Sequence, residues 1–448
     1  MRKQLRFLAR VVWLSRIACC VIAAVCTTVA TADEDPRRTP IVRVYEQCSP
    51  AVVHVTGPHV QKDTPSTLEF FAPPDTPALP QLVGTGFIVH QDGYMFTAAH
   101  GVLDLVSPQI ILKGGKKLPA EVLAVDPRFD VALLKIESAD PLPTIPLAES
   151  GDVLVGETVV AIGSPHGFQQ TCSKGIVSAL GRTTNPSGLP GVTLRDLIQG
   201  DVPINPGNSG GPWLNVLGQA IGMTTTRKDD AENIAFAIPS SALHGVLGEL
   251  LAAQRHPAFG LGLQFTTDGA STIANLHADS PAAAAGLQVG DVIQTLGETP
   301  VGSSGQFYLT LIDKKAGDLV RIEFLRGDTP MVAEITLPEL AAVDSKASIR
   351  KRLAIDVAPL SDKQTKEMQL RVPRGVLVES VFPGPFDELE HSPAPGDVIA
   401  RVGYIRPRDA DHLALLLERQ PRDQPVALVF LRHRNNKSTR LDVKAILP

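Results

Sequence analysis

Residues 205–212 read NPGNSGGP, a serine set among three glycines and flanked by two prolines. Gly, Pro, Asn and Ser are the commonest residues of turns, so the octapeptide taken alone predicts a surface loop. It predicts a catalytic loop only if the chain also supplies a base for the serine proton and a third group that orients the base. The interpretation therefore depends on a histidine and a carboxylate elsewhere in the chain.

Two stretches ahead of Ser209 offer these partners. His100 ends the run FTAAH, whose small residues leave room around an imidazole ring. The chain has 11 histidines, so an ordinary histidine is the default interpretation of any one of them. Asp130 directly precedes the apolar run 131–136, where a carboxylate can be partly buried and orient the ring. Asp126 is expected to close the turn before it.

The first 32 residues are typical of an export signal. Basic residues precede an apolar run at 17–30, and Ala30-Thr31-Ala32 has the small residues of a cleavage site. We expect cleavage after Ala32 and export to the periplasm or a similar compartment, with no stable membrane span afterwards. A retained anchor is the less favoured alternative, because the apolar run is shorter than the ~20 residues a span needs.

Charge and cysteine content narrow the function classes. The segment before residue 33 carries five basic and no acidic residues, so its removal takes the net charge from -5 to -10. Such an acidic chain is a poor candidate for binding nucleic acid. Of the five cysteines, only Cys48 and Cys172 lie beyond the signal, and we expect two unpaired thiols, although one bridge is possible. No spacing suggests a metal site or a cofactor.

Short β-branched runs bounded by Gly, Pro or Asp predict a mainly β first domain, either a barrel or a sandwich. They lie at 51–55, 86–89, 131–136, 158–162 and 175–180.

Three further segments frame these strands. Residues 33–40 are charged and contain proline, which predicts a mobile lead-in. The proline-rich stretch 64–80 predicts a long loop, whose Phe70 and Phe71 either anchor it or make a regulatory or oligomer contact. Apolar spacing predicts a closing helix over 240–253, and His256-Pro257 begins a linker.

The C-terminal part contains an internal repeat. The tetrapeptide GDVI at 290–293 recurs at 396–399, an offset of 106 residues (396 minus 290), and Val320, Phe324, Leu325 and Arg326 recur at the same offset. The period is too long for a solenoid, so it indicates two copies of one small domain. Helix-like stretches at 306–312 and 410–417 lie inside the two copies.

The order His100, Asp130, Ser209 is that of chymotrypsin-like proteases. The blocks GTGFIVHQDGYMFTAAH, DPRFDVALLKI, AIGSPHGFQQTCSKGIVSALGR and INPGNSGGP occur in that order, and with the downstream repeat they resemble the HtrA (DegP/DegQ, protease Do) family of exported serine endopeptidases. The resemblance covers nearly everything after the signal. It implies a mainly β fold, a chymotrypsin-like double β-barrel followed by two PDZ domains. The boundaries it suggests are 1–32 for the signal, 33–255 for the protease, 256–341 for the first PDZ domain and 342–448 for a divergent second.

The same resemblance implies the site residues. His100 is the general base, Asp130 its orienter and Ser209 the nucleophile, while the backbone N–H groups of Gly207 and Ser209 form the oxyanion hole. A substrate pocket is implied at Thr224, Thr225, Thr226, Ile234, Ala235 and Phe236. The first PDZ copy is implied to receive a peptide carboxylate at Gly260, Leu261 and Gly262. The equivalent stretch of the second copy, 352–356, lacks the glycines, which favours a spacer or assembly module.

Several positions depart from the family pattern. Ala98 and Ala99 stand where two asparagines are usual, and Pro203 removes a backbone donor close to the nucleophile. Ala235 replaces a usual glycine, and Arg227 and Lys228 lie in a pocket segment whose family expectation is an apolar pocket for small aliphatic side chains. None of these changes deletes a catalytic group.

The leading hypothesis is an ATP-independent serine endopeptidase that cuts unfolded or damaged proteins. The expected partners are unfolded polypeptides and C-terminal peptides, and the resemblance implies a homotrimer or higher oligomer. Two alternatives stay open: a PDZ-based chaperone or scaffold with a resting protease domain, and a regulatory protease that cuts one specific partner.

Overall fold

The structure is a computed structural model of the 448-residue chain. It describes residues 35–448 except 59–80, 104, 106–107, 150, 165–169, 186–191, 228–231, 253–259, 267, 340–343, 368–374, 388, 390–391, 404, 406, 419, 421–424 and 435–436. The predicted export signal, the Phe70-Phe71 loop and the His256-Pro257 linker lie outside the described residues. The chain separates into two units, Met1–Arg43 and Val44–Pro448.

The described residues of the first unit form a turn and the start of a helix that the sequence did not lead us to expect. Asp35 and Arg37 form an exposed ion pair at 2.6 Å in the turn. Helix α2 (Pro40–Cys48) then begins at a proline, whose missing N–H costs nothing at the first helical position. Within the predicted lead-in, the described residues thus have local structure.

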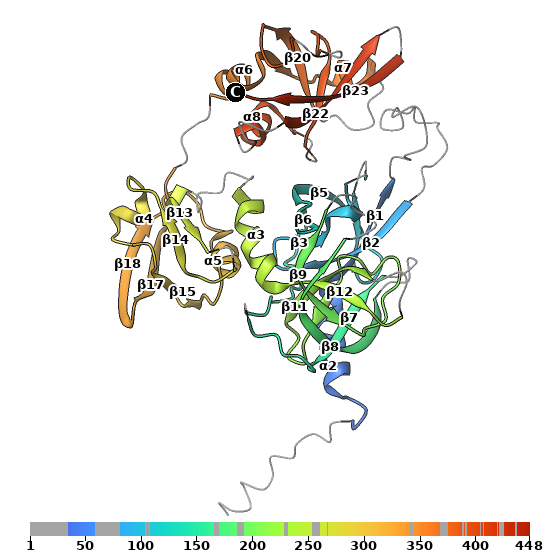
Figure 1. Ribbon diagram of the computed structural model, residues 1–448, viewed down its shortest axis with the longest axis vertical. Helices are drawn as coiled ribbons and strands as arrows, with labels where there is room; N and C mark the ends of the chain where they lie inside the picture. Colours follow the sequence, from blue (N-terminus) through green and yellow to red (C-terminus); the bar gives the residue numbers. More distant parts are fainter. Residues whose placement is uncertain are drawn as a thin grey trace, which may run out of the picture. The chain divides into compact units, whose positions relative to one another are not determined.

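The first barrel of the second unit closes in the strand order β1-β2-β3-β6-β5-β4 (Figure 1). Short 3-10 turns precede β1 and follow β3, at Ser49–Ala51 and Ala99–Gly101. The strands are β1 (Val52–Pro58), β2 (Gln81–Ile88), β3 (Tyr94–Ala98), β4 (Gln109–Ile111), β5 (Lys117–Asp126) and β6 (Val131–Ile136). Phe87, Phe96 and Leu133 are fully buried in this barrel.

The second barrel closes in the order β10-β11-β12-β9-β8-β7 around the buried Trp213. Its strands are β7 (Thr158–Gly163), β8 (Thr171–Thr184), β9 (Leu194–Gly200), β10 (Pro212–Leu214), β11 (Ala220–Arg227) and β12 (Ala235–Pro239). Helix α3 (Ser240–Ala252) follows, as the sequence predicted. The five predicted strand runs all fall on strands, and the two closed barrels confirm the chymotrypsin-like double barrel.

The first C-terminal copy has a strand pair β13-β14 and a four-stranded sheet in the order β16-β15-β17-β18. Phe307 of helix α5 is buried against Phe265, with ring centroids 4.9 Å apart. The elements are β13 (Leu263–Phe265), β14 (Ile273–Leu276), α4 (Pro281–Ala284), β15 (Val292–Leu296), β16 (Thr299–Pro300), α5 (Ser304–Leu311), β17 (Leu319–Arg326) and β18 (Thr329–Thr336).

The second copy is a five-stranded sheet in the order β19-β20-β21-β22-β23 with three helices in its described part. Its core gathers Phe386, Phe430 and Leu413 among other buried apolar residues. The elements are α6 (Ser345–Leu353), β19 (Ile355–Pro359), α7 (Asp362–Glu367), β20 (Val376–Val381), β21 (Val398–Val402), α8 (Ala410–Glu418), β22 (Pro425–Arg434) and β23 (Lys437–Ile446).

An ion pair between a buried aspartate and a partly exposed arginine explains part of the sequence repeat. Arg326 binds Asp291 through two hydrogen bonds of 2.8–2.9 Å, and Arg432 binds Asp397 with the same atoms and the same distances. In each copy the aspartate lies just before one sheet strand and the arginine lies on the next, so the pair ties β15 to β17 and β21 to β22. The repeated aspartate and arginine therefore make the same structural contact in both copies.

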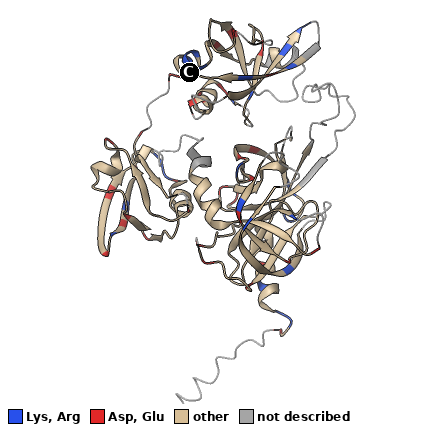
Figure 2. Cartoon of the chain, in the orientation of Figure 1, with Lys and Arg blue, Asp and Glu red and all other residues tan. Residues whose placement is uncertain are grey.

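Charged residues of both signs are spread over the protein, and its two described cysteines are unpaired. Lys and Arg are interspersed with Asp and Glu along the described elements (Figure 2). Cys48 is buried, Cys172 is exposed, and no disulfide joins them. Among the described residues, no helix combines the length and the apolar character needed to cross a membrane.

Candidate active site

The structure brings His100 and Asp130 into direct contact. His100 lies in the 3-10 turn after β3, and Asp130 lies directly before β6, the strand that pairs with β3. The imidazole Nδ1 is 2.9 Å and 3.0 Å from the two oxygens of Asp130, and the backbone N–H of His100 donates to the same carboxylate at 3.0 Å. An ionised carboxylate only accepts hydrogen bonds, so Nδ1 carries a proton and a neutral ring would present Nε2 as a base.

Asp130 is held in an unusual setting. Its side chain is fully buried, and its backbone is left-handed with φ +54°. The turn before it is closed by Asp126, which accepts from Arg128 N at 3.0 Å and pairs with the Arg128 side chain, as the sequence analysis expected. A left-handed non-glycine residue costs of order 1–3 kcal/mol and persists only where its surroundings fix it.

The Ser209 loop is anchored on both sides. Ser209 O accepts from Thr85 N of β2 at 3.0 Å, which joins the loop to the first barrel. Gly210 N donates to Thr224 O of β11 at 2.8 Å. Gly210 has φ +85°, and a Cβ there would lie 2.2 Å from Thr85 O, so only glycine fits this close approach between the barrels.

Thr225 connects Ser209 to Asp130. It sits at the register shift between β11 and β12, so its side chain leaves the regular strand pattern. Thr225 Oγ1 donates to Asp130 Oδ2 at 2.5 Å, while its carbonyl accepts from Ser209 Oγ at 3.2 Å. In the described residues no hydrogen bond joins Ser209 to His100. The serine hydroxyl therefore donates to the carbonyl of Thr225, the residue whose side chain binds Asp130.

The two amides predicted for the oxyanion hole are available. Among the described residues, neither Gly207 N–H nor Ser209 N–H donates to an acceptor. Gly207 has φ +100°, a conformation that favours glycine. Asn208 N donates to Asn205 O at 3.0 Å and so closes the turn that leads into Ser209.

Two opposing effects set the pKa of His100. Burial of the ring lowers it, and the hydrogen bond and charge of Asp130 raise it more, so the pKa lies above the ordinary 6.5. The ring keeps a quarter of its side-chain surface exposed, at 25%. Asp130 thus favours the protonated ring, the form that a base reaches after it takes a proton.

The predicted pocket residues lie on two paired strands and their approach. Thr224, Thr225 and Thr226 are in β11, Ala235 and Phe236 are in β12, and Ile234 directly precedes β12. All but Ile234 and Thr226 are buried. Arg227 at the end of β11 is exposed, and Lys228 lies outside the described residues. The substrate-binding role of this segment stays a prediction.

The predicted carboxylate loop of the first C-terminal copy lies directly before β13. Gly260 and Leu261 form the end of a 3-10 turn, and the side chain of Leu261 is fully buried. Gly262 has φ +73°, and a Cβ there would lie 2.3 Å from the Ser280 side chain. In the second copy Ala354 takes the corresponding left-handed conformation before β19, with φ +53°.

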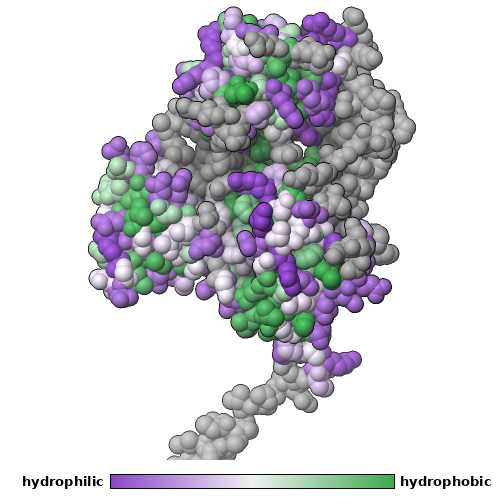
Figure 3. All heavy atoms as spheres, in the orientation of Figure 1, coloured by the Kyte–Doolittle hydropathy of each residue, from purple (hydrophilic) through white to green (hydrophobic). Residues whose placement is uncertain are grey.

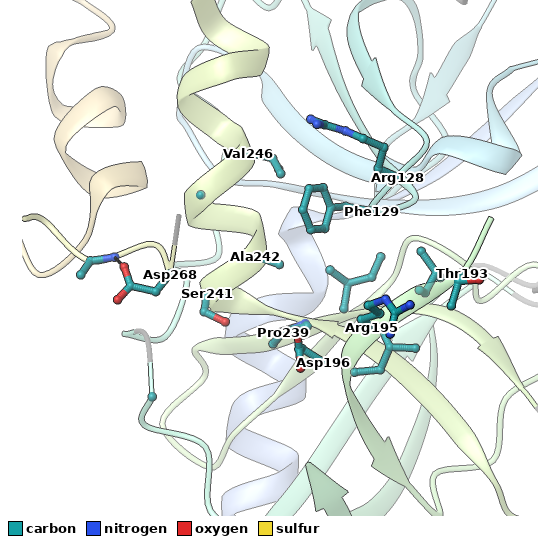
Figure 4. Close-up of a pocket in the computed structure, with 16 residues that line it drawn as sticks. Arg128, Phe129, Thr193, Arg195, Asp196, Pro239, Ser241, Ala242, Val246 and Asp268 are labelled. Carbon is teal, nitrogen blue, oxygen red and sulfur yellow. Dashed lines mark hydrogen bonds between the residues drawn. The ribbon is translucent and has the colours of Figure 1, made fainter. Parts of the chain in front are cut away.

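A separate pocket of about 760 Å³ lies beside the turn that carries Asp130. Figure 4 shows the ring of Phe129 facing helix α3 near Val246, with Arg195 and Asp196 of β9 on another wall. None of His100, Asp130 and Ser209 lines this pocket. It is therefore not the place where the predicted triad would meet a substrate.

One group of side chains in the described part of the chain brings metal-binding atoms together. His90, Asp92 and Asp313 offer ligand atoms within 4.8 Å of one another. Both aspartates are exposed, and exposed carboxylates often cluster without a metal, so we assign no ion to this group.

The sequence analysis missed two contacts. Thr85 lies inside the quoted block GTGF, and its flanking glycines were the available signal that its strand is approached closely. Thr225 was named only for the substrate pocket, and its bond to Asp130 depends on a register shift that strand patterns do not reveal.

Comparison with known families agrees with this architecture. Residues 84–223 match the model of the trypsin-like peptidase domain, and residues 258–337 match the model of the PDZ domain. The double barrel, which matches the trypsin-like peptidase domain, and the PDZ domain define the class, a trypsin-like serine endopeptidase that carries a PDZ domain.

Relatives that match most of the chain identify its family. A probable periplasmic serine endoprotease, DegP-like, from Pseudomonas fulva (strain 12-X) is 34% identical over 458 residues, covering 90% of this chain and 93% of that protein. The similarly named protein of Pseudomonas fluorescens (strain Pf-5) is 32% identical over 452 residues, covering 90% and 92%. The chain belongs to the HtrA family of periplasmic serine endoproteases.

A solved structure is also similar. The HtrA-type protease AlgW with a decapeptide is 28% identical and covers 68% of this chain and 99% of that one. Its TM-score of 0.40 is low, so the family assignment rests on the sequences.

Proposed function

We propose that this protein hydrolyses peptide bonds through Ser209, His100 and Asp130. His100 Nε2 takes the proton of Ser209 Oγ as the oxygen attacks the peptide carbonyl, and it then donates that proton to the leaving amine. Asp130 stabilises the imidazolium formed in between. The amides of Gly207 and Ser209 receive the developing oxyanion.

The contact between His100 and Asp130 is the observation that supports this proposal most strongly. A fully buried carboxylate bonded to both Nδ1 and the backbone N–H of one histidine fixes the ring and its tautomer. For catalysis, the hydroxyl of Ser209 has to leave Thr225 O and turn to Nε2. Catalytic hydrogen bonds are often incomplete before substrate binds, so this arrangement fits a protease between turnovers.

The proposed substrates are unfolded or damaged polypeptides, which offer extended chain to the site. We propose that the first PDZ domain binds C-terminal peptides beside Gly260–Gly262, where a peptide would add as a strand to the edge strand β13. The second copy is proposed to be a divergent PDZ domain, because it repeats the left-handed residue before β19 and the buried Asp–Arg pair. A homotrimer is proposed as the assembly.

A second candidate function is a chaperone or scaffold with a resting protease domain. The hydrogen bond from Ser209 Oγ to Thr225 O favours it, because the nucleophile is held away from its base. The two candidates predict different fates for bound substrate.

Degradation of a permanently unfolded polypeptide tests the proposal. Wild type and Ser209→Ala are incubated with it, and cleavage is followed on a gel while binding is followed by sedimentation. We expect wild type to clear the polypeptide and Ser209→Ala to bind it uncut. Binding without cleavage by both proteins, even with apolar C-terminal peptides added, would favour the chaperone instead.

A further inference from the structure

Thr85 is a buried residue whose N–H, carbonyl and hydroxyl make four hydrogen bonds, two of them to the loop that carries Ser209. It lies on β2 in the first barrel and has no exposed surface. Its N–H donates to Ser209 O at 3.0 Å, and its carbonyl accepts from Thr97 Oγ1 of β3 at 2.7 Å. A buried residue with such complete pairing is held in one position.

The hydroxyl of Thr85 joins two segments of the other barrel. It donates to Gly207 O at 2.6 Å and accepts from Ser164 N, the residue after β7, at 2.9 Å. A threonine hydroxyl has a single proton, so this pairing gives the proton to Gly207. The Gly207 carbonyl is thereby fixed by the side chain of a neighbouring barrel.

Fixing this carbonyl fixes the peptide plane that follows Gly207. Asn208 N–H lies in the same plane and donates to Asn205 O at 3.0 Å, so two hydrogen bonds restrain the plane. Glycine adopts many backbone conformations, so its own sterics add no restraint. Rotation would redirect the chain entering Ser209 and misalign the amides of Gly207 and Ser209. Oxyanion donors act only when they lie about 2.7–3.1 Å from the developing charge, so such a displacement is costly.

We propose that Thr85 is a positioning residue for the oxyanion hole, acting through its hydroxyl on the Gly207 carbonyl. The inference rests on the proposed function, because it assigns Gly207 and Ser209 to the oxyanion hole. Among the described residues, no hydrogen bond joins Thr85 to His100 or Asp130. Loss of Thr85 should therefore weaken transition-state stabilisation without changing the base.

The test compares four full-length variants with wild type. Thr85→Val removes the hydroxyl at nearly constant shape, Thr85→Ala removes it with less volume, and Thr85→Ser keeps it. The matched control is Thr56→Val on the paired strand β1, since Thr56 is buried at 4% exposure and its hydroxyl has no hydrogen-bond partner within the described part of the chain. Initial rates of cleavage of a fluorescent unfolded polypeptide give kcat and KM, each at several pH values, and thermal unfolding verifies the fold.

We expect Thr85→Val and Thr85→Ala to lower kcat about 10-fold to 100-fold, the range for misplaced catalytic groups, with KM within about twofold of wild type. The pH midpoint should stay that of wild type, because the His100–Asp130 pair is untouched. Thr85→Ser should keep kcat within about threefold, and Thr56→Val within about twofold. If Thr85→Val does not fold, Thr85→Ala and Thr85→Ser carry the comparison.

Two results overturn the inference alone: an active wild type with an equally active Thr85→Val or Thr85→Ala, or a folded Thr85→Ser as impaired as the variants without a hydroxyl. A shifted pH midpoint would also contradict it, because that would place the effect of Thr85 on the base. A wild type that binds the polypeptide without cleaving it overturns the proposed function, and this inference falls with it.

Discussion

At the scale of single residues, the buried carboxylate of Asp130 makes the most contacts of the three proposed catalytic side chains, with three hydrogen-bond donors. It accepts from His100 Nδ1, from the His100 backbone and from Thr225 Oγ1, so its buried oxygens are hydrogen-bonded. The hydrogen bonds also fix the imidazole ring in one plane. Charge and orientation at His100 therefore both depend on the same residue.

The pH dependence of activity should report this contact. Burial lowers the pKa of His100, and the hydrogen bond and charge of Asp130 raise it above 6.5 overall. A general base acts in its neutral form, so kcat/KM should rise with pH through a midpoint above 6.5. In Asp130→Asn only the lowering effect of burial remains, and the midpoint should fall below 6.5.

The same variant should lose about 10⁴-fold in kcat, because an asparagine favours the wrong imidazole tautomer. Rate profiles from pH 5 to 9 on an unfolded polypeptide give both quantities. A midpoint that is the same in wild type and Asp130→Asn would show that Asp130 does not set the pKa of the base.

Single residues were predictable where their sequence neighbours carry information. The small residues of FTAAH selected His100 among 11 histidines, and the structure brings His100 into contact with Asp130. The left-handed backbone of Asp130 was not predictable, because its turn pattern does not specify φ at a non-glycine residue. The hydroxyl bond of Thr85 was not predictable, because it depends on how the two barrels meet. Threonine in a strand is typical of any sheet, so its pattern gives no sign of such a contact.

At the scale of elements, the Asp–Arg pair locks one strand to the next in each C-terminal copy. Asp291 and Asp397 are almost fully buried, whereas Arg326 and Arg432 reach them from the sheet with part of their surface exposed. Each aspartate also accepts a backbone N–H, from Gln288 and Ala394 respectively. The two copies therefore provide a matched pair of experiments within one chain.

Replacing the arginine should loosen the strands that it joins. Arg326→Leu leaves the buried Asp291 without its charged partner, which destabilises a protein more than the pair itself stabilises it. We expect hydrogen exchange in β15 and β17 to accelerate at least about tenfold, with β21 and β22 unchanged. Arg432→Leu should give the reverse pattern, and the same change in both copies for either variant would contradict a local role.

Strands and helices were predicted correctly where the runs of apolar residues were long. The runs at 131–136 and 158–162 matched β6 and β7 closely, and the apolar spacing at 240–253 matched α3. Helix α2 was not predicted, because its nine residues make little more than two turns, too few for apolar spacing to indicate a helix. Barrel closure followed from the family resemblance, since strand runs alone were equally consistent with a sandwich.

At the scale of the whole molecule, the protease domain exposes an apolar patch formed by Leu154, Val155 and Ile176. These side chains are exposed at 64%, 63% and 41%, and the backbone of the 154–157 loop pairs with β8 at Val177. Hydrophobic residues also gather on part of the visible face of this domain (Figure 3). Contiguous apolar surface of this kind marks protein interaction sites.

The patch should contribute to self-association. We expect the protein to sediment as a trimer and Leu154→Glu to shift it toward smaller species, because the new charge would have to be buried. Analytical ultracentrifugation over a concentration series measures this. The control is Leu319→Glu, at an exposed leucine of β17 with a similar 64% exposure. A trimer unaffected by Leu154→Glu would place the subunit contact elsewhere.

Covalent labelling of the nucleophile tests the central claim most directly. A fluorophosphonate reacts with a serine only when a base and an oxyanion hole activate it. Wild type is labelled, digested and mapped by mass spectrometry, with Ser209→Ala as the matched control. The account predicts a single adduct on Ser209 that forms faster as pH rises and is absent from Ser209→Ala. An adduct on another residue, or none in a folded wild type, would contradict the assignment of Ser209, His100 and Asp130.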